Sequence, residues 1–316
     1  MKESVLPHGI FRKEVYMSLG SLPVIVPSRY YAYTDGGARF SMTSAVDFLA
    51  DNGFDGIDLS LDTVSGIGDG RPSFDDDWRG VLYSFGSRAA ARGLTIPTCH
   101  LPFYMPSPDD ADAMSRFAKS QLLGLDAAAM LKIPCAVIHP IVRHSSQRKR
   151  RAWLDENLSY LSPIRERAAR LGVTLAIENM AGVPYPYAPD ETVYGSRAAD
   201  VRLLADRLDT GICWDFGHAH LSHLCQSAEL ATVGDRLRMI HIHDNDGAND
   251  RHLIPLAGSI DWDDALRGLR AIDFHSMSWR CLNLELKTSH LPADRPTRDR
   301  HAAATIEAAR RLMRGM

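Results

Sequence analysis

The chain has 316 residues and a formal net charge of −3, with 45% hydrophobic and 24% charged residues. This composition is typical of a globular protein with a sizeable core, and the net charge excludes nucleic-acid or membrane binding driven by overall charge. No apolar run approaches the roughly 20 residues of a membrane-spanning helix, the N-terminus has no apolar secretion-signal segment, and the five cysteines form no CxxC pair, so we expect a cytoplasmic protein.

One pattern repeats along the chain: a charged helical stretch, a Gly or Pro, a short apolar β-prone run and a polar loop. We place a first strand within Val15–Leu19, and helices at Val46–Asn52, Ser84–Arg92, Ala113–Leu131, Trp153–Leu171, Arg197–Leu208, Leu230–Leu237, Trp262–Ala271 and Arg298–Met313. The strands that follow these helices contain GFDGIDLSL, LTIPTCHLPF, CAVIHP, VTLAIENM, ICWDFGH, RMIHIHD and WRCLNLEL. Gly53, Gly93, Gly172 and Gly211 stand where a helix commonly ends in a left-handed residue.

Eight alternating strand and helix units predict the fold. Continuous apolar strands between helices indicate a parallel sheet that is covered on both faces. Eight such units favour a closed barrel, so we expect a single (β/α)₈ TIM-barrel domain over residues 1–316, with strands and helices from about residue 15 to 313. No GxGxxG follows the first strand and no GxxxxGK[ST] occurs, so we expect no nucleotide cofactor. The polar loops at Pro27–Gly37, Gly66–Asp77 and Val183–Ser196 look like lids over a site.

Histidines and carboxylates recur at the C-terminal ends of the predicted strands. They are His100, His139, Glu178, Asp215, His218, His241, His243 and Glu285, with Asp250 and His252 in the loop after the seventh strand. The C-terminal ends of barrel strands converge on one face, where active sites are built. Converging imidazoles and carboxylates suit zinc, manganese or iron.

Four of these residues form the predicted metal-binding core: Glu178, Asp215, His243 and Glu285. Buried unpaired carboxylates are costly, and a cation removes that cost. Asp215 could instead cap the following helix. His241 and His243 alternate along one strand and so point the same way. Because His243 lies nearer the rim, we expect it to be the ligand and His241 to pack deeper or form a hydrogen bond.

The ordered segments CHLPF, AVIHP, LAIENM, WDFGH, HIHDNDG, DRHLIPLAGSIDW and LNLEL resemble the xylose isomerase-like TIM barrel superfamily, which includes sugar isomerases, epimerases and endonuclease IV. The resemblance runs from about Gly53 to Glu285. It implies one divalent metal on the four core residues, with Mn²⁺ favoured over Zn²⁺ or Mg²⁺, and a small carbohydrate substrate. Glu178 and Glu285 would then be the catalytic acid/base pair of an isomerase or epimerase, working through a metal-stabilised enediolate. His218 and Arg251 would contact the substrate. The sequence leaves the oligomeric state open and allows a homo-oligomer.

The resemblance also implies an alternative, a multi-zinc phosphodiesterase that acts on abasic DNA. Endonuclease IV holds three zinc ions with nine ligands, and all nine have a chemical match here: His100, His139, Glu178, Asp215, His218, His243, Asp250, His252 and Glu285. The rim segments PSRYYAYTDGG and VPYPYAPD are aromatic and nearly neutral, which favours a sugar. We interpret the basic run Gln147–Arg151 as a solvated helix start. A non-catalytic barrel that binds a sugar or glycoside is a second alternative, but such a barrel would have no need of the full ligand set.

Overall fold

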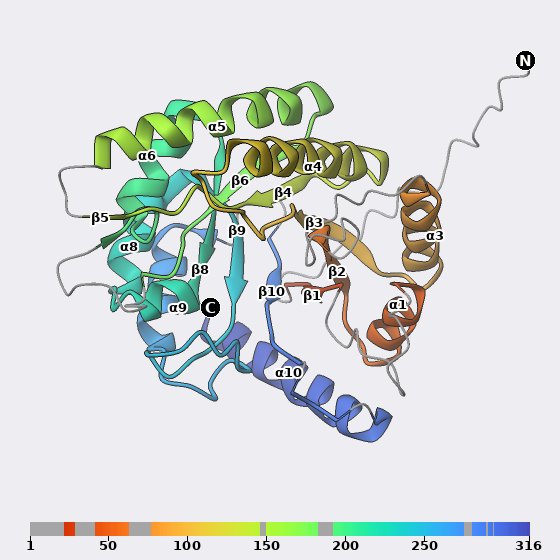
Figure 1. Cartoon of the computed structure of the whole chain (residues 1–316). Helices are drawn as coiled ribbons and strands as arrows, with labels where there is room; N and C mark the ends of the chain where they lie inside the picture. Colours follow the sequence, from red (N-terminus) through yellow and green to blue (C-terminus); the bar gives the residue numbers. More distant parts are fainter. Residues whose placement is uncertain are drawn as a thin grey trace, which may run out of the picture.

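The computed structural model describes residues 22–28, 42–62, 77–145, 150–182, 192–274, 280–288, 290–292 and 294–316. Within these ranges eight parallel strands form a closed barrel in the order β1-β10-β9-β8-β6-β4-β3-β2 (Figure 1). The strands are β1 (Val24–Pro27), β2 (Gly56–Ser60), β3 (Thr95–His100), β4 (Cys135–Ile138), β6 (Thr174–Glu178), β8 (Gly211–Asp215), β9 (Leu237–Ile242) and β10 (Leu282–Leu284). The predicted (β/α)₈ barrel is confirmed.

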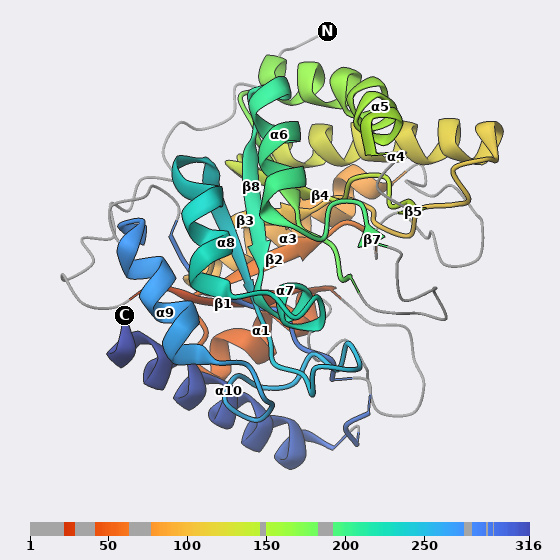
Figure 2. The ribbon, with the colours of Figure 1, turned by 90° about the vertical axis from the view of Figure 1, so that its left-hand side faces the viewer.

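The helices surround the strands, and Figure 2 shows α5, α6, α8 and α9 along one side of the barrel. The helices are α1 (Met42–Asp51), α3 (Trp78–Ala91), α4 (Ala111–Met130), α5 (Arg150–Leu171), α6 (Ala198–Leu208), α7 (Phe216–Leu221), α8 (Gln226–Val233), α9 (Trp262–Ala271) and α10 (Arg295–Gly315). Aspartates cap several helix starts: the Asp110 side chain accepts from Ala113 N at 2.9 Å and the Asp294 side chain from Thr297 N at 2.8 Å. No helix in the described ranges is long and apolar enough to cross a membrane.

Successive residues of each strand point alternately outward and inward, and this alternation places the site. In β2, Ile57 and Leu59 belong to the main hydrophobic core under the helices, while Asp58 between them is buried on the opposite face. In β8, Ile212 and Trp214 likewise face the helices. A separate small apolar cluster lies inside the barrel and consists of Ile25, Cys135, Val137, Ala176, Cys213, Met239 and Cys281. The polar residues that follow these on the same strand face therefore also point into the barrel.

The structure corrects several predicted boundaries. The first barrel strand is Val24–Pro27, whereas the predicted Val15–Leu19 lies outside the described residues. The helix predicted at Leu230–Leu237 ends at Val233 and is followed by the 3₁₀ turn Gly234–Arg236. Gly53, Gly93 and Gly172 have the expected positive φ, but Gly211 lies in β8, and Asp209 with φ 51° ends α6 instead. Aspartate adopts this left-handed conformation more readily than most residues do.

Two local elements were not predicted. The short helix α7 begins directly after β8, and β5 (His144–Ser145) pairs antiparallel with β7 (Thr192–Val193). This small sheet joins the loop after β4 to the loop after β6. Most residues of the three predicted lid loops lie outside the described residues.

Candidate metal centre

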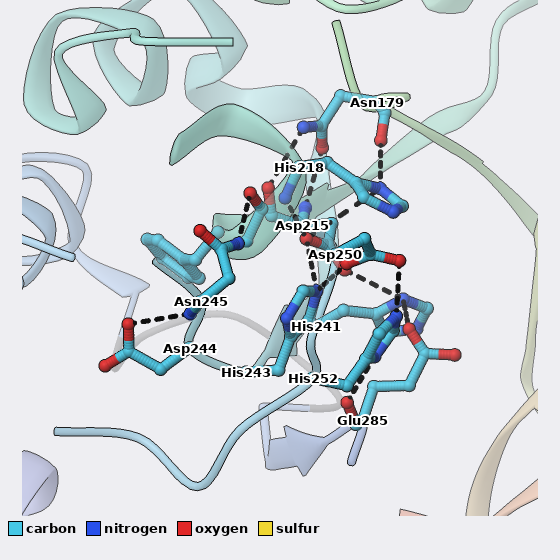
Figure 3. Close-up of polar contacts among 12 residues, drawn as sticks. Asn179, Asp215, His218, His241, His243, Asp244, Asn245, Asp250, His252 and Glu285 are labelled. Atoms are coloured by element: carbon cyan, nitrogen blue, oxygen red, sulfur yellow. Dashed lines mark hydrogen bonds and ion pairs between the residues drawn. The ribbon is translucent and has the colours of Figure 1, made fainter. Parts of the chain in front are cut away.

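A cluster of histidine and carboxylate side chains fills the end of the barrel at which the strands terminate (Figure 3). Each member lies at the C-terminal end of a strand or in the loop or short helix that follows it, as the barrel geometry predicts. The cluster consists of His100, His139, Glu178, Asp215, His218, His241, His243, Asp250, His252 and Glu285. The structure therefore brings the predicted histidines and carboxylates into one site.

Glu178, the last residue of β6, lies at the middle of the cluster. Its Oε2 is 3.1 Å from His100 Nε2 and 3.3 Å from His139 Nε2. Its Oε1 is 3.1 Å from His241 Nδ1 and 3.4 Å from His218 Nδ1. Burial alone would raise the pKa of Glu178, but the surrounding imidazoles outweigh burial and hold that pKa well below its usual range. Glu178 is thus a carboxylate anion that several imidazole nitrogens approach at once.

Three carboxylates and one imidazole form the largest of the close groups among the described residues. The ligand atoms of Glu178, Asp215, His241 and Glu285 all lie within 4.8 Å of one another, and all four side chains are buried. His241 Nδ1 is 3.4 Å from Glu285 Oε2 and 3.9 Å from Asp215 Oδ2. Three buried anions so close together repel one another, and a divalent cation between them would relieve both the repulsion and the cost of burial. The donor set therefore fits a divalent metal ion.

The fourth member of this group is His241, whereas the predicted ligand His243 lies in a neighbouring group with Asp215 and His218, and its role as a metal ligand stays a prediction. Both residues point into the barrel, but the strand register places His241 opposite Asp215 on β8 and opposite Asn283 on β10. His241 is therefore level with Asp215, the last residue of β8, and with Asn283 on β10, which lies two residues before Glu285. His243 follows β9 and stands one step closer to the rim.

His243 belongs to an outer group together with Asp215, His218, Asp250 and His252. His243 Nε2 is 3.1 Å from Asp215 Oδ1, and the imidazole stacks on that of His252 with ring centroids 3.9 Å apart. His252 Nε2 lies 2.8 Å from Asp250 Oδ2. Nδ1 of His243 and one oxygen of Asp250 are buried without a hydrogen-bond partner among the described residues. Buried polar atoms are nearly always hydrogen-bonded, so these unpaired atoms are candidates for further metal-ligand atoms.

Backbone carbonyls fix the orientation of three of the imidazoles. The Nδ1 atoms of His100, His218 and His252 lie 2.8, 2.8 and 2.6 Å from the carbonyl oxygens of Leu101, Asn179 and Glu285. Donation from Nδ1 holds each ring so that Nε2 points into the cluster, where Nε2 of His100 faces Glu178 and Nε2 of His252 faces Asp250. Metal-ligating histidines in proteins are oriented in this way by a second hydrogen bond.

The pKa values of the buried histidines also indicate a site that binds a cation. Burial opposes protonation of His218, but Asp215, Glu178 and Asp250 outweigh it and raise the pKa of His218 to about 9. Burial likewise opposes the charge of His243, and Asp215 and Asp250 raise its pKa. Without another cation, protonated imidazoles must balance the carboxylates. A bound metal ion would take over that role and release protons.

Two residues support the cluster in a way that the sequence did not predict. Asn179 follows Glu178; its side chain accepts from Asp215 N at 2.6 Å and donates to Asp215 O at 3.0 Å. Asp244 is buried and accepts from Trp262 Nε1 at 2.9 Å and Leu256 N at 3.0 Å, so it anchors the loop that carries Asp250 and His252. Their positions directly after Glu178 and His243 were the only signals in the sequence.

The remaining predicted contacts lie further out. Arg251 is exposed, and its Nε lies 2.8 Å from Asp246 Oδ2. A role for Arg251 in substrate binding stays a prediction. Asp215 is both the N-cap of α7, accepting from His218 N at 2.6 Å, and a member of the cluster, because its Oδ2 has no hydrogen-bond partner within the described ranges. The two interpretations of Asp215 are therefore compatible.

Comparison with known proteins identifies the family. A family model of xylose isomerase-like TIM barrels matches residues 46–313. The protein y4fM of Sinorhizobium fredii is 41% identical over 66 residues, and MJ1311 of Methanocaldococcus jannaschii is 30% identical over 126 residues. These matches cover 21% and 38% of this chain and only 21% and 41% of the two relatives.

Solved structures show the same fold. A D-tagatose 3-epimerase-like protein superposes with a TM-score of 0.69 at 19% identity, covering 93% of this chain and 97% of that one. D-psicose 3-epimerase determined with D-fructose superposes with a TM-score of 0.66 at 15% identity, and the match covers 92% of this chain and 99% of that one. L-ribulose 3-epimerase superposes with a TM-score of 0.65 at 17% identity, and the match covers 93% of this chain and 96% of that one. The family model spans nearly all of the barrel, and the chain belongs to the xylose isomerase-like TIM barrel family.

Proposed function

We propose that this protein is a divalent-metal-dependent isomerase or epimerase of a sugar or sugar derivative. The observation that carries the proposal is the group of Glu178, Asp215, His241 and Glu285, whose ligand atoms lie within 4.8 Å of one another at the C-terminal end of the barrel. The fold supports the proposal, because sugar epimerases are among the solved structures that share it.

Glu178 and Glu285 are the proposed acid/base pair. Both are buried, and both lie within 3.4 Å of the same atom, His241 Nδ1. One carboxylate removes the proton next to the substrate carbonyl, and the other returns a proton to the opposite face or to the neighbouring carbon. Fixed, desolvated carboxylates suit this task because general-base catalysis depends first on geometry. His218, whose Nε2 is free of the backbone contact made by Nδ1, would contact a substrate hydroxyl.

Asp215, His241 and the two glutamates would hold the metal ion, which supplies Lewis-acid stabilisation of the negative charge that develops on the substrate oxygen. Three carboxylates and one imidazole favour Mn²⁺ or Mg²⁺, whereas the histidines of the outer group favour Zn²⁺. We propose Mn²⁺, because the four-residue group is rich in carboxylates.

The proposal is tested by incubating chelator-treated protein with a panel of ketoses (D-tagatose, D-psicose, D-fructose and L-ribulose) with and without added Mn²⁺. We expect a new sugar isomer and incorporation of solvent deuterium at the carbon next to the carbonyl, both dependent on Mn²⁺. Turnover that persists in metal-free protein would contradict the proposed mechanism. No turnover of the panel or of keto-glycosides with Mn²⁺, Zn²⁺ or Mg²⁺ would contradict the proposed function.

One observation favours a second candidate, a phosphodiesterase that uses several metal ions. The cluster also contains the separate groups His100–His139–Glu178 and His243–Asp250–His252, each with ligand atoms within 4.8 Å of one another. However, Arg150 in the basic run at 147–151 is ion-paired with Asp200, which lowers its availability for phosphate. Three metal ions per chain and cleavage of an abasic-site duplex would favour this candidate, and one metal ion without cleavage would exclude it.

A further inference from the structure

A buried cysteine lies directly beneath the candidate metal centre. Cys213 stands two residues before Asp215 on β8, so both side chains point into the barrel, and the Cα of Cys213 lies about 6–7 Å deeper than that of Asp215. The strand register places Cys213 opposite Glu178 on β6 and opposite Met239 on β9. The Cys213 side chain is fully buried. The proton-transfer mechanism gives this thiol no role.

Cys213 forms a compact group with two residues of the metal centre. The ligand atoms of Glu178, Cys213 and His241 all lie within 4.8 Å of one another, and all three side chains are buried. The Cys213 thiol is also hydrogen-bonded to the His241 imidazole. Asp215 and Glu285 belong to the other group that contains Glu178 and His241. Glu178 and His241 therefore have two sets of neighbouring donors, two carboxylates and one deeper thiol.

The two sets of donors suit different cations. Three carboxylates and one imidazole are oxygen-rich and suit Mn²⁺ or Mg²⁺, whereas a soft thiolate selects zinc and other thiophilic metals. Three protein ligands are enough to hold a zinc ion when water or another group takes the fourth position. Ligand atoms 2.0–2.3 Å from one zinc ion stand about 3.3–3.8 Å apart in a tetrahedral site. The group of Glu178, Cys213 and His241 would therefore have to close by at most about 1.5 Å.

We propose that Glu178, Cys213 and His241 form an inner cation site that takes a thiophilic divalent cation such as Zn²⁺, Co²⁺ or Cd²⁺. The cation replaces the proton of the thiol, which passes to solvent, and nothing is oxidised. Because Glu178 and His241 are shared, a cation in the inner site competes with Mn²⁺ held by the four-residue group. The inference rests on the metal-binding roles that the proposed function gives to Glu178 and His241, and on none of its sugar chemistry.

The test compares wild-type protein with Cys213→Ser, both full-length, chelator-treated and kept reduced. Co²⁺ is added without any sugar, and the readout is the near-ultraviolet charge-transfer absorption of a thiolate–Co²⁺ bond, which carboxylate and imidazole ligands do not produce. We expect this band in wild-type protein and not in Cys213→Ser. Affinities are measured by titration calorimetry. Cys213→Ser should weaken Cd²⁺ binding by about tenfold or more and change Mn²⁺ binding by less than about twofold, because thiolates favour soft cations.

Competition between the two positions is measured by the electron paramagnetic resonance signal of free Mn²⁺. Adding Cd²⁺ to Mn²⁺-loaded wild-type protein should release Mn²⁺, and Cys213→Ser should need about ten times more Cd²⁺ for the same release, in proportion to its weaker Cd²⁺ binding. Mn²⁺ that stays bound to wild-type protein while Cd²⁺ occupies the thiol would contradict the competition.

Cys281→Ala is the matched control. Cys281 is buried in the same small apolar cluster inside the barrel as Cys213, and its Sγ lies 3.8 Å from Met239 Sδ. It belongs to none of the metal-ligand groups found among the described residues. We expect Cys281→Ala to keep both the charge-transfer band and the Cd²⁺ affinity. Should Cys213→Ser not fold, Cys213→Ala, which adds no polar group to the barrel interior, decides by the same criteria.

The inner site is refuted if Co²⁺ binds to wild-type protein without the charge-transfer band, if Cys213→Ser keeps the band, or if Cys281→Ala removes it. These outcomes are separate from those of the isomerase proposal. Mn²⁺-dependent sugar turnover without a thiolate band overturns the inner site alone. A band that depends on Cys213, together with no turnover of any sugar, supports the inner site and overturns the isomerase proposal. Failure to bind any divalent cation contradicts both.

Discussion

Replacing Glu178 with glutamine tests the central residue of the candidate site. The substitution keeps the shape of the side chain and removes its charge and its ability to accept a proton. Glu178 faces imidazole nitrogens of His100, His139, His218 and His241 at 3.1–3.4 Å. General-base groups contribute about 10²- to 10⁴-fold, so we expect Glu178→Gln to lower kcat by that factor, equivalent to about 3–5 kcal/mol in the barrier.

The assay is the initial rate of sugar interconversion at saturating Mn²⁺, so that weaker metal binding does not imitate a slower proton transfer. Metal content is measured on the same samples. Glu156→Gln is the control, because the Glu156 carboxylate lies on α5, pairs with Arg143 at 2.8 Å and is absent from the metal-binding group. We expect the control to keep wild-type kcat. A kcat for Glu178→Gln within tenfold of wild type, with metal bound, would refute the assignment of Glu178 as the base.

Further outcomes follow from the same geometry. Removing metal with a chelator should lower Tm by about 5 °C relative to protein held at 100 times the Kd of Mn²⁺, since saturation adds about 2.7 kcal/mol; an unchanged Tm would argue against a metal centre. His241→Gln should weaken Mn²⁺ binding at least tenfold more than His243→Gln, and equal losses measured by calorimetry would contradict the choice of His241. Burial lowers the pKa of His301 to about 4, so its contribution to stability is complete above about pH 6.5 and is lost as pH falls toward 4. Between pH 7 and pH 4, the Tm of wild-type protein should therefore fall by more than the Tm of His301→Gln. Equal decreases in Tm would show that protonation of His301 does not contribute to the pH dependence of stability.

The sequence determined the architecture and indicated most of the side chains that the structure brings together at the candidate site. The alternation of apolar strands with charged helices predicts the barrel because each strand must be covered on both faces. Glu178, Asp215 and Glu285 could be identified because each ends an apolar strand, and parallel strands of a barrel all end on the same face. No contact between distant residues had to be known for either inference.

Only the tertiary structure decided which histidine joins the three carboxylates. His241 and His243 share one strand face, so periodicity cannot separate them. Their relative height depends on the stagger between neighbouring strands, and the register opposite Asp215 and Asn283 favours His241. Stagger is a property of the closed barrel and leaves no mark in the local sequence.

The buried hydrogen bond between Asp58 and Asn283 inside the barrel was hidden for a similar reason. Asp58 and Asn283 are 225 positions apart in the chain, and each looks like a single polar residue within an apolar strand. Closure of the barrel brings β1, β2 and β10 together and turns both side chains into the same interior. The local sequence specifies which face of its strand each side chain occupies, and the closed sheet specifies which side chains meet there.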